Sequence, residues 1–91
     1  MRPYDKGNVM NEVLGMIKNF IEGRIDPVEF SVMLPDILIQ KYDEMLNDNK
    51  QLTELLNDNL PEICAKYEPG MDSKEFINAV QEEYDKALKF T

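Results

Sequence analysis

Apolar residues recur along the chain at spacings of three and four, and they nowhere alternate strictly with polar residues over the length of a strand. This pattern predicts helices. The first helix is expected over residues 8–22, with Asn8 as its N-cap and Gly23 as the left-handed residue that ends it. Its inward face would consist of Val9, Val13, Met16, Ile17, Phe20 and Ile21.

The second helix has the clearest start signal in the chain. Asp26 is a favourable cap, Pro27 suits the first turn, and Glu29 stands at the third helical position. Pro35 lies inside the apolar pattern that follows, where proline removes a backbone donor and crowds the preceding turn. We therefore expect a kink or break at residues 31–34. The apolar face would comprise Phe30, Leu34, Ile37, Leu38, Tyr42 and Met45.

Two further helices complete the pattern. One is expected over residues 50–67, bent at Pro61 and ended by Pro69 and Gly70. Its inward residues would be Leu52, Leu55, Leu56, Leu60, Ile63, Cys64 and Tyr67. The last helix would continue to about residue 90 and bury Phe76, Ile77, Val80, Tyr84 and Leu88.

Short connections of about three to five residues favour antiparallel packing of consecutive helices. The sequence therefore predicts an all-α fold, a compact four-helix antiparallel bundle with kinks at Pro35 and Pro61. Residues 1–91 would form a single helical domain. Apolar residues make up 43% of the chain and charged residues 31%, which is the balance of a soluble globular domain.

The charge balance narrows the class of partner. Ten basic residues against 18 acidic ones give a net charge of -8. DNA, RNA and acidic lipid surfaces would repel such a chain, because phosphate binding depends on clustered Lys and Arg. We therefore expect no direct nucleic acid ligand and no membrane, whereas a basic protein would be attracted. No apolar run reaches the about 18–20 residues of a membrane span, and no signal-peptide pattern is found, so the expected location is the cytoplasm.

Candidate chemistry is sparse. The chain has no histidine, which removes the usual general base, the usual zinc ligand and both familiar nucleophile triads. The lone Cys64 cannot form an internal disulfide and is interpreted as a small core residue. Glu82 and Glu83 point about 100° apart on a helix, so both are assigned to the surface rather than to a catalytic pair. We therefore expect no enzyme, no metal and no cofactor.

Acidic residues gather on the third predicted helix. Glu54, Asp58 and Glu62 follow one another at four-residue spacing, opposite the leucines, so three like charges share one exposed face. A solvated face and a docking stripe for a cationic cleft both account for this pattern. A second acidic group, Asp43, Glu44 and Asp48, is placed near the end of the second helix, where the helix dipole disfavours negative charge.

The connection to the last helix continues the acidic surface. Glu68 precedes the Pro-Gly turn, and Asp72, which with Ser73 is the candidate cap, stands three residues before Glu75. This is also the spacing of a cap and its reciprocal partner, so local helix stabilisation is the alternative to docking. Tyr67 at the helix end is either an interface anchor or a ring in the core with its hydroxyl at the rim.

Two short segments carry a family resemblance. Residues 20–30 read Phe-Ile-Glu-Gly-Arg-Ile-Asp-Pro-Val-Glu-Phe, so that a helix end, a short turn and a Glu-Phe pair follow one another, and Tyr-Glu-Pro stands at 67–69. The chain resembles, over about residues 13–88, the small immunity proteins that protect bacteria from colicin D-like tRNA nucleases. Ala65 and Gly70 depart from this likeness, since a more acidic residue there would suit contact with a nuclease.

The resemblance implies a helical bundle that performs no chemistry and covers the active cleft of a basic toxin nuclease domain. Its carboxylates would stand where tRNA phosphates lie. Binding would be one to one, by a free form that is a monomer. The expected partner-binding residues are Glu54, Asp58, Glu62, Tyr67, Glu68, Asp72 and Glu75. The alternative is a small regulatory or adaptor protein that acts through homo-oligomerisation or through a partner on an apolar helix face.

Overall fold

A computed structural model describes residues 8–90, which form five helices and contain no strand. The helices are α1 (Asn8–Ile21), α2 (Pro27–Gln40), α3 (Tyr42–Asp48), α4 (Lys50–Lys66) and α5 (Ser73–Leu88). The all-α prediction is confirmed, whereas the predicted number of four helices is wrong. The N-cap prediction for Asn8 concerns a side chain that lies outside the described part of the chain.

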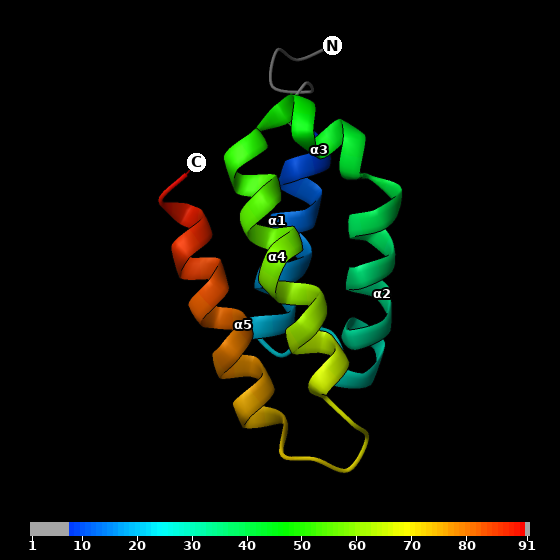
Figure 1. The fold of residues 1–91 in the computed structure, drawn as a ribbon. Helices are drawn as coiled ribbons and strands as arrows, with labels where there is room; N and C mark the ends of the chain where they lie inside the picture. Colours follow the sequence, from blue (N-terminus) through cyan, green and yellow to red (C-terminus); the bar gives the residue numbers. More distant parts are fainter. Residues whose placement is uncertain (1–7, 91) are drawn as a thin grey trace.

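Four long helices run alternately in opposite directions, and the short α3 crosses one end of them (Figure 1). Helix α4 packs against α2, α3 and α5, and α1 packs against the same three helices. The turns between α1 and α2 and between α4 and α5 lie at the end opposite α3 (Figure 1). One face of the molecule therefore presents α4 between α2 and α5.

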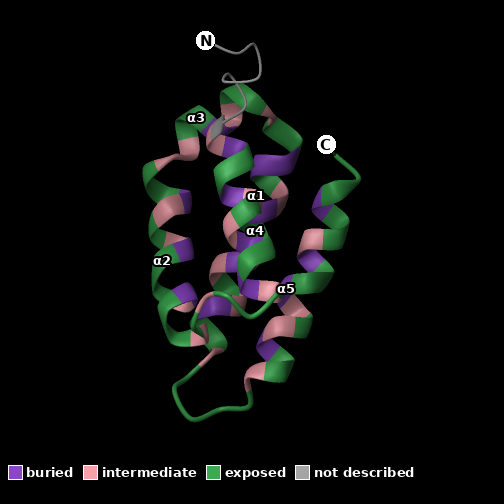
Figure 2. Ribbon diagram, turned by 180° about the vertical axis from the view of Figure 1, so that it is seen from behind, coloured by how far each residue is buried: buried purple, intermediate pink, exposed green. Residues whose placement is uncertain are grey.

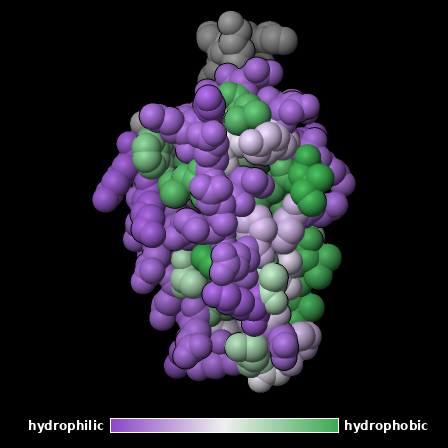
Figure 3. Space-filling model, viewed as in Figure 1, coloured by the Kyte–Doolittle hydropathy of each residue, from purple (hydrophilic) through white to green (hydrophobic). Residues whose placement is uncertain are grey.

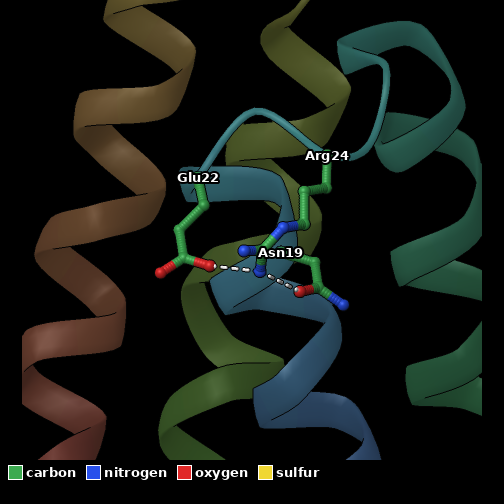
Figure 4. Close-up of polar contacts among 3 residues, drawn as sticks. All are labelled: Asn19, Glu22 and Arg24. Atoms are coloured by element: carbon green, nitrogen blue, oxygen red, sulfur yellow. Dashed lines mark hydrogen bonds and ion pairs between the residues drawn. The ribbon is translucent and has the colours of Figure 1, made fainter.

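The turn from α1 to α2 has the geometry that its sequence predicts. Gly23 has φ 84, and its N–H bonds the Phe20 carbonyl at 3.0 Å while the Arg24 N–H bonds the Asn19 carbonyl at 2.8 Å. These two bonds form a Schellman motif, which satisfies the last carbonyls of α1. The Arg24 guanidinium also contacts the Glu22 carboxylate at 2.6 Å and the Asn19 side chain at 3.3 Å across the turn (Figure 4).

Asp26 caps α2 as expected. Its carboxylate accepts hydrogen bonds from the backbone N–H groups of Val28 at 3.0 Å and Glu29 at 3.3 Å, and Pro27 occupies the first turn. A cap of this kind stabilises a helix by about 1 kcal/mol.

The break expected at residues 31–34 is not present, because α2 continues through Pro35 to Gln40, with Lys41 as its C-cap. Proline leaves the Ser31 carbonyl without its helical donor, but both residues are only partly buried, so water can satisfy the carbonyl. Lys41 alone separates α2 from α3. The change of direction there allows Met45 to enter the core, where its exposed fraction is 0%.

The interruption at Lys41 also changes the environment of the second acidic group. Asp43 and Glu44 lie in the first turn of α3, where the helix dipole favours negative charge, and not near the C-terminus of a longer helix as predicted. The second predicted bend site, Pro61, likewise lies inside a continuous helix, α4.

Asn49 joins three parts of the chain. Its side-chain oxygen caps α4 by accepting from the Leu52 N–H at 3.0 Å, and its side-chain NH₂ donates to the Phe90 carbonyl at 2.7 Å. Its own N–H bonds the Met45 carbonyl at 2.9 Å, which closes α3. One residue therefore fixes the end of α3, the start of α4 and the position of the chain after α5.

A single hydrophobic cluster receives residues from every helix (Figure 2). The Cα radius of gyration is 12.9 Å, close to the about 12 Å expected for a compact chain of this length. The buried apolar residues are Met10, Val13, Ile17, Phe20, Phe30, Leu34, Leu38, Met45, Leu52, Leu56, Leu60, Cys64, Phe76, Val80 and Ala87.

Aromatic rings gather at the end of the core nearest the two turns. The rings of Phe20 and Phe30 stack with centroids 4.0 Å apart, and Phe76 lies 4.9 Å from Phe20 and 5.9 Å from Phe30. Tyr67 stacks on Phe76 at 4.6 Å. This aromatic cluster (Phe20, Phe30, Tyr67 and Phe76) ties α1, α2 and α5 to the residue that follows α4, and each such pair adds about 0.5–1.5 kcal/mol beyond its buried area.

The buried row of α5 differs from the prediction at its C-terminal half. Phe76, Val80, Glu83 and Ala87 are buried, whereas Leu88 is 46% exposed. These four positions follow the spacing of four, three and four that keeps residues on one helix face. Because Phe76 fixes this row, Glu83 enters the protein and Leu88 lies outside the row.

The two glycines of α1 and its turn predict opposite responses to alanine. Gly15 is helical, Gly23 has φ 84, and a Cβ at either position meets no atom within 4 Å. Gly15→Ala should raise the free energy of unfolding by about 0.5–1 kcal/mol, and Gly23→Ala should lower it by about 1 kcal/mol. Urea denaturation measures both changes. Changes of the same sign in the free energy of unfolding of the two variants would contradict the left-handed conformation of Gly23.

Candidate partner-binding surface

The predicted acidic stripe lies on the outer side of α4. Glu54, Asp58 and Glu62 are all exposed, and Figure 3 shows hydrophilic atoms over much of this helix. Glu62 forms an ion pair with Lys66 at 3.3 Å, between side chains that are 66% and 74% exposed. An exposed pair of this kind is worth little to stability, but it partly neutralises one end of the stripe. Glu54 and Asp58 form no ion pair within residues 8–90.

The chain reverses direction through a tight turn after α4. The Met71 N–H bonds the Glu68 carbonyl at 3.0 Å, with Pro69 and Gly70 between them and Gly70 at φ 98. Proline followed by a glycine of positive φ is the pattern of a type II turn. The Tyr-Glu-Pro segment therefore shapes the connection between α4 and α5, and the exposed Glu68 lies at its start.

A groove of about 240 Å³ opens where α4 ends and α5 begins. Tyr67 is half-buried there, and its ring stacks on the buried Phe76. The groove is lined by Ile63, Lys66, Tyr67, Met71, Asp72, Glu75, Phe76 and Ala79. Its surface is mostly apolar, with two carboxylates and one ammonium group among its lining residues. Such a groove suits an apolar side chain that carries or adjoins a cation.

Three of the seven predicted residues, Tyr67, Asp72 and Glu75, meet around this groove. Asp72 caps α5 by accepting from the Lys74 N–H at 2.9 Å, so its local role is confirmed. The reciprocal bond expected from Glu75 is absent within residues 8–90, and its carboxylate is exposed. The reciprocal bond therefore does not explain a carboxylate at this position, whereas the helix dipole still favours one in the first turn of α5.

The other four residues do not line the groove. Glu54, Asp58 and Glu62 extend away from it along α4, and Glu68 stands in the adjoining turn. Sequence reasoning missed the apolar lining and Lys66. Met71 directly follows the Pro-Gly pair, which is a sequence signal for an exposed apolar residue at a turn, and it is 47% exposed. Ala79 gives no such signal.

Glu83 is the clearest correction to the surface prediction. Only 6% of this residue is exposed. Its carboxylate accepts a hydrogen bond from the Asn59 side chain at 2.8 Å and forms an ion pair with Lys86 at 3.1 Å. Asn59 lies on α4, so this contact joins α4 to α5. The partly exposed Lys86 compensates the buried charge from the solvent side. Both carboxylate oxygens of Glu83 therefore have partners within the fold.

The remaining candidate chemistry is also structural. Cys64 is 3% exposed, and burial raises the pKa of its thiol to about 12. A thiol held protonated in this way is a poor nucleophile. Within residues 8–90, no group of three or more Cys, Asp or Glu side chains is placed to hold a metal ion, and no helix has the length and hydropathy needed to cross a membrane.

Comparison with protein-family models, with curated proteins and with solved structures finds no match to this chain. The family resemblance therefore stays a prediction.

Replacing the buried carboxylate should cost more stability than replacing its exposed neighbour. Glu83→Ala leaves the Asn59 amide without its partner and should lower the free energy of unfolding by about 1–3 kcal/mol. Glu82→Ala is the matched control and should change it by less than about 0.5 kcal/mol. Equal losses in urea denaturation would contradict the contact between α4 and α5.

The Cys64 thiol predicts a stability change in alkali. Its pKa is raised from 9.0 to about 12 by burial, so the thiolate forms more readily in the unfolded chain. The stabilisation by Cys64 is therefore complete below pH 9 and is lost as pH rises towards 12. The wild type should lose stability relative to Cys64→Ala by up to about 1.4 kcal/mol per pH unit in this range. Every other side chain is common to the two proteins, so a difference that stays constant with pH would contradict burial of the thiol.

Proposed function

We propose that this protein is an immunity protein that binds and inhibits a basic toxin nuclease domain, of the kind that cleaves tRNA. One observation carries the proposal. The half-buried Tyr67 and the exposed Asp72 and Glu75 meet at an open apolar groove, and the exposed carboxylates of α4 continue from it. The same turn contains the Tyr-Glu-Pro segment on which the family resemblance rests.

Inhibition on this proposal is steric and electrostatic. The exposed carboxylates of Glu54, Asp58 and Glu68 would face the Arg and Lys side chains that otherwise hold tRNA phosphates. Charge-assisted hydrogen bonds of this kind are stronger than neutral ones. The groove beside Tyr67 would bind an apolar side chain of the nuclease. Side chains that fill such pockets commonly contribute much of the binding energy at the centre of an interface.

The charge of the chain supports rapid association. A protein of net charge -8 and a cationic cleft attract each other over about one Debye length, near 10 Å at 0.1 M salt. Added salt shortens this range and should slow association. The interaction of Glu62 with Lys66 reduces the contribution expected from that carboxylate.

The second candidate is a regulatory or adaptor protein that acts through homo-oligomerisation or through a partner on an apolar helix face. The observation that favours it is the exposure of large apolar side chains on α2, where Val32 is 69% exposed and Ile39 is 76% exposed. It predicts a stable homo-oligomer in the absence of any toxin.

The proposal predicts tight one-to-one binding to a recombinant colicin D-like nuclease domain. Calorimetry should show affinity that falls with salt, and the same mixtures should lose tRNA cleavage. Asp58→Asn with Glu75→Gln should weaken binding at least about tenfold without unfolding the protein.

The matched control is Glu12→Gln, which neutralises an exposed carboxylate on α1. Its affinity should stay within about twofold of the wild type, because an isolated exposed charge outside the interface contributes little. Binding that leaves tRNA cleavage intact, or equal losses in the control and the double variant, would contradict occlusion by this surface.

A further inference from the structure

Helix α2 presents an apolar row to solvent. Val28 is 40% exposed, Val32 69% and Ile39 76%, and the partly buried Pro35 stands between the last two. The four positions are spaced by four, three and four residues, so they share one face of the helix. Figure 3 shows hydrophobic atoms along the edge of the molecule that α2 occupies. We name these four residues the α2 row.

The fold does not account for the α2 row. The core contacts of α2 are made by Phe30, Leu34 and Leu38, which lie on another side of the helix and are buried. Valine and isoleucine are also weaker helix formers than alanine, because their branched side chains lose rotamer freedom against the preceding turn. Neither packing within the chain nor helix propensity therefore requires Val32 and Ile39.

Two carboxylates flank the α2 row on one side. Glu29 and Asp36 each follow a member of the row by one residue, which places them about 100° around the helix. Both are exposed, and neither forms an ion pair within residues 8–90. Asp36 accepts one hydrogen bond, from the Gln40 side chain at 2.9 Å. The row is thus an apolar strip with a negative border.

We infer that the α2 row docks an amphipathic helix of the basic partner, whose apolar residues cover the row and whose Lys or Arg side chains meet Glu29 and Asp36. The inference rests on the proposed function and adds a second contact to it. Helix α4 packs against both α2 and α5, so the acidic residues of α4 lie between the α2 row and the groove (Figure 1). One partner can therefore reach both surfaces.

Charge disfavours a second copy of this chain as the occupant. Two copies could pack their α2 helices antiparallel through this row, related by a two-fold axis that passes between Met33 and Leu34. Glu29 of one copy would then lie on the same side of the helix pair as Asp36 of the other copy. Like charges at such positions repel, and each copy carries a net charge of -8.

The test compares two α2 variants with the wild type in calorimetry against the same colicin D-like nuclease domain. Val32→Ala with Ile39→Ala should weaken binding at least tenfold while the melting temperature of the free protein stays equal or rises. Glu29→Gln with Asp36→Asn should weaken binding and reduce its salt dependence. Phe90→Ala, at an exposed apolar residue after α5, is the matched control and should bind as the wild type does.

The possible results separate this inference from the proposed function. The inference alone would be overturned if Val32→Ala with Ile39→Ala bound as tightly as the wild type while Asp58→Asn with Glu75→Gln still weakened binding. Absence of binding by the wild type would overturn both. A wild-type dimer in sedimentation that Val32→Ala with Ile39→Ala converts to a monomer would assign the row to a second copy and overturn the inference.

Discussion

The stacking of Tyr67 on Phe76 connects the core of this protein to its candidate surface. Phe76 is 5% exposed and also contacts the Phe20 and Phe30 rings, which hold the α1 to α2 turn in place. Tyr67 is the first residue after α4, so its position fixes where the Pro-Gly turn begins. The depth of the groove and the place of Asp72 and Glu75 at its edge follow from this contact. A change in the aromatic cluster would therefore alter the surface as well as the stability.

Two surfaces of different character lie on either side of α4. The groove between α4 and α5 is apolar with acidic edges, and α2 carries an exposed apolar row with an acidic border. Carboxylates alone would attract many cationic surfaces, because charge gives encounter rate more than discrimination among partners. Apolar side chains that must fit a partner add that discrimination. The proposed immunity function needs both, since a toxin must be recognised specifically as well as met quickly.

Local signals in the sequence predicted the ends of helices well, because caps and turns depend on a few neighbouring residues. Asp26 caps α2, Gly23 ends α1, and Gly70 provides the turn after α4. Features that depend on distant contacts were missed. The break at Lys41 reflects the entry of Met45 into the core, and the burial of Glu83 depends on Asn59 from another helix. The acidic stripe was predicted as an exposed set, but the groove requires the Tyr67 and Phe76 contact, which no local pattern contains.

The most direct test of the proposed docking face is a map of amide chemical shifts in the ¹⁵N-labelled protein on addition of the nuclease domain. Docking at this face should produce the largest changes at the exposed residues of α4, at the turn between α4 and α5, and along the α2 row. The exposed side of α1, which includes Glu12, should change little. Changes centred on α1, with the groove and α4 unaffected, would contradict docking at this face.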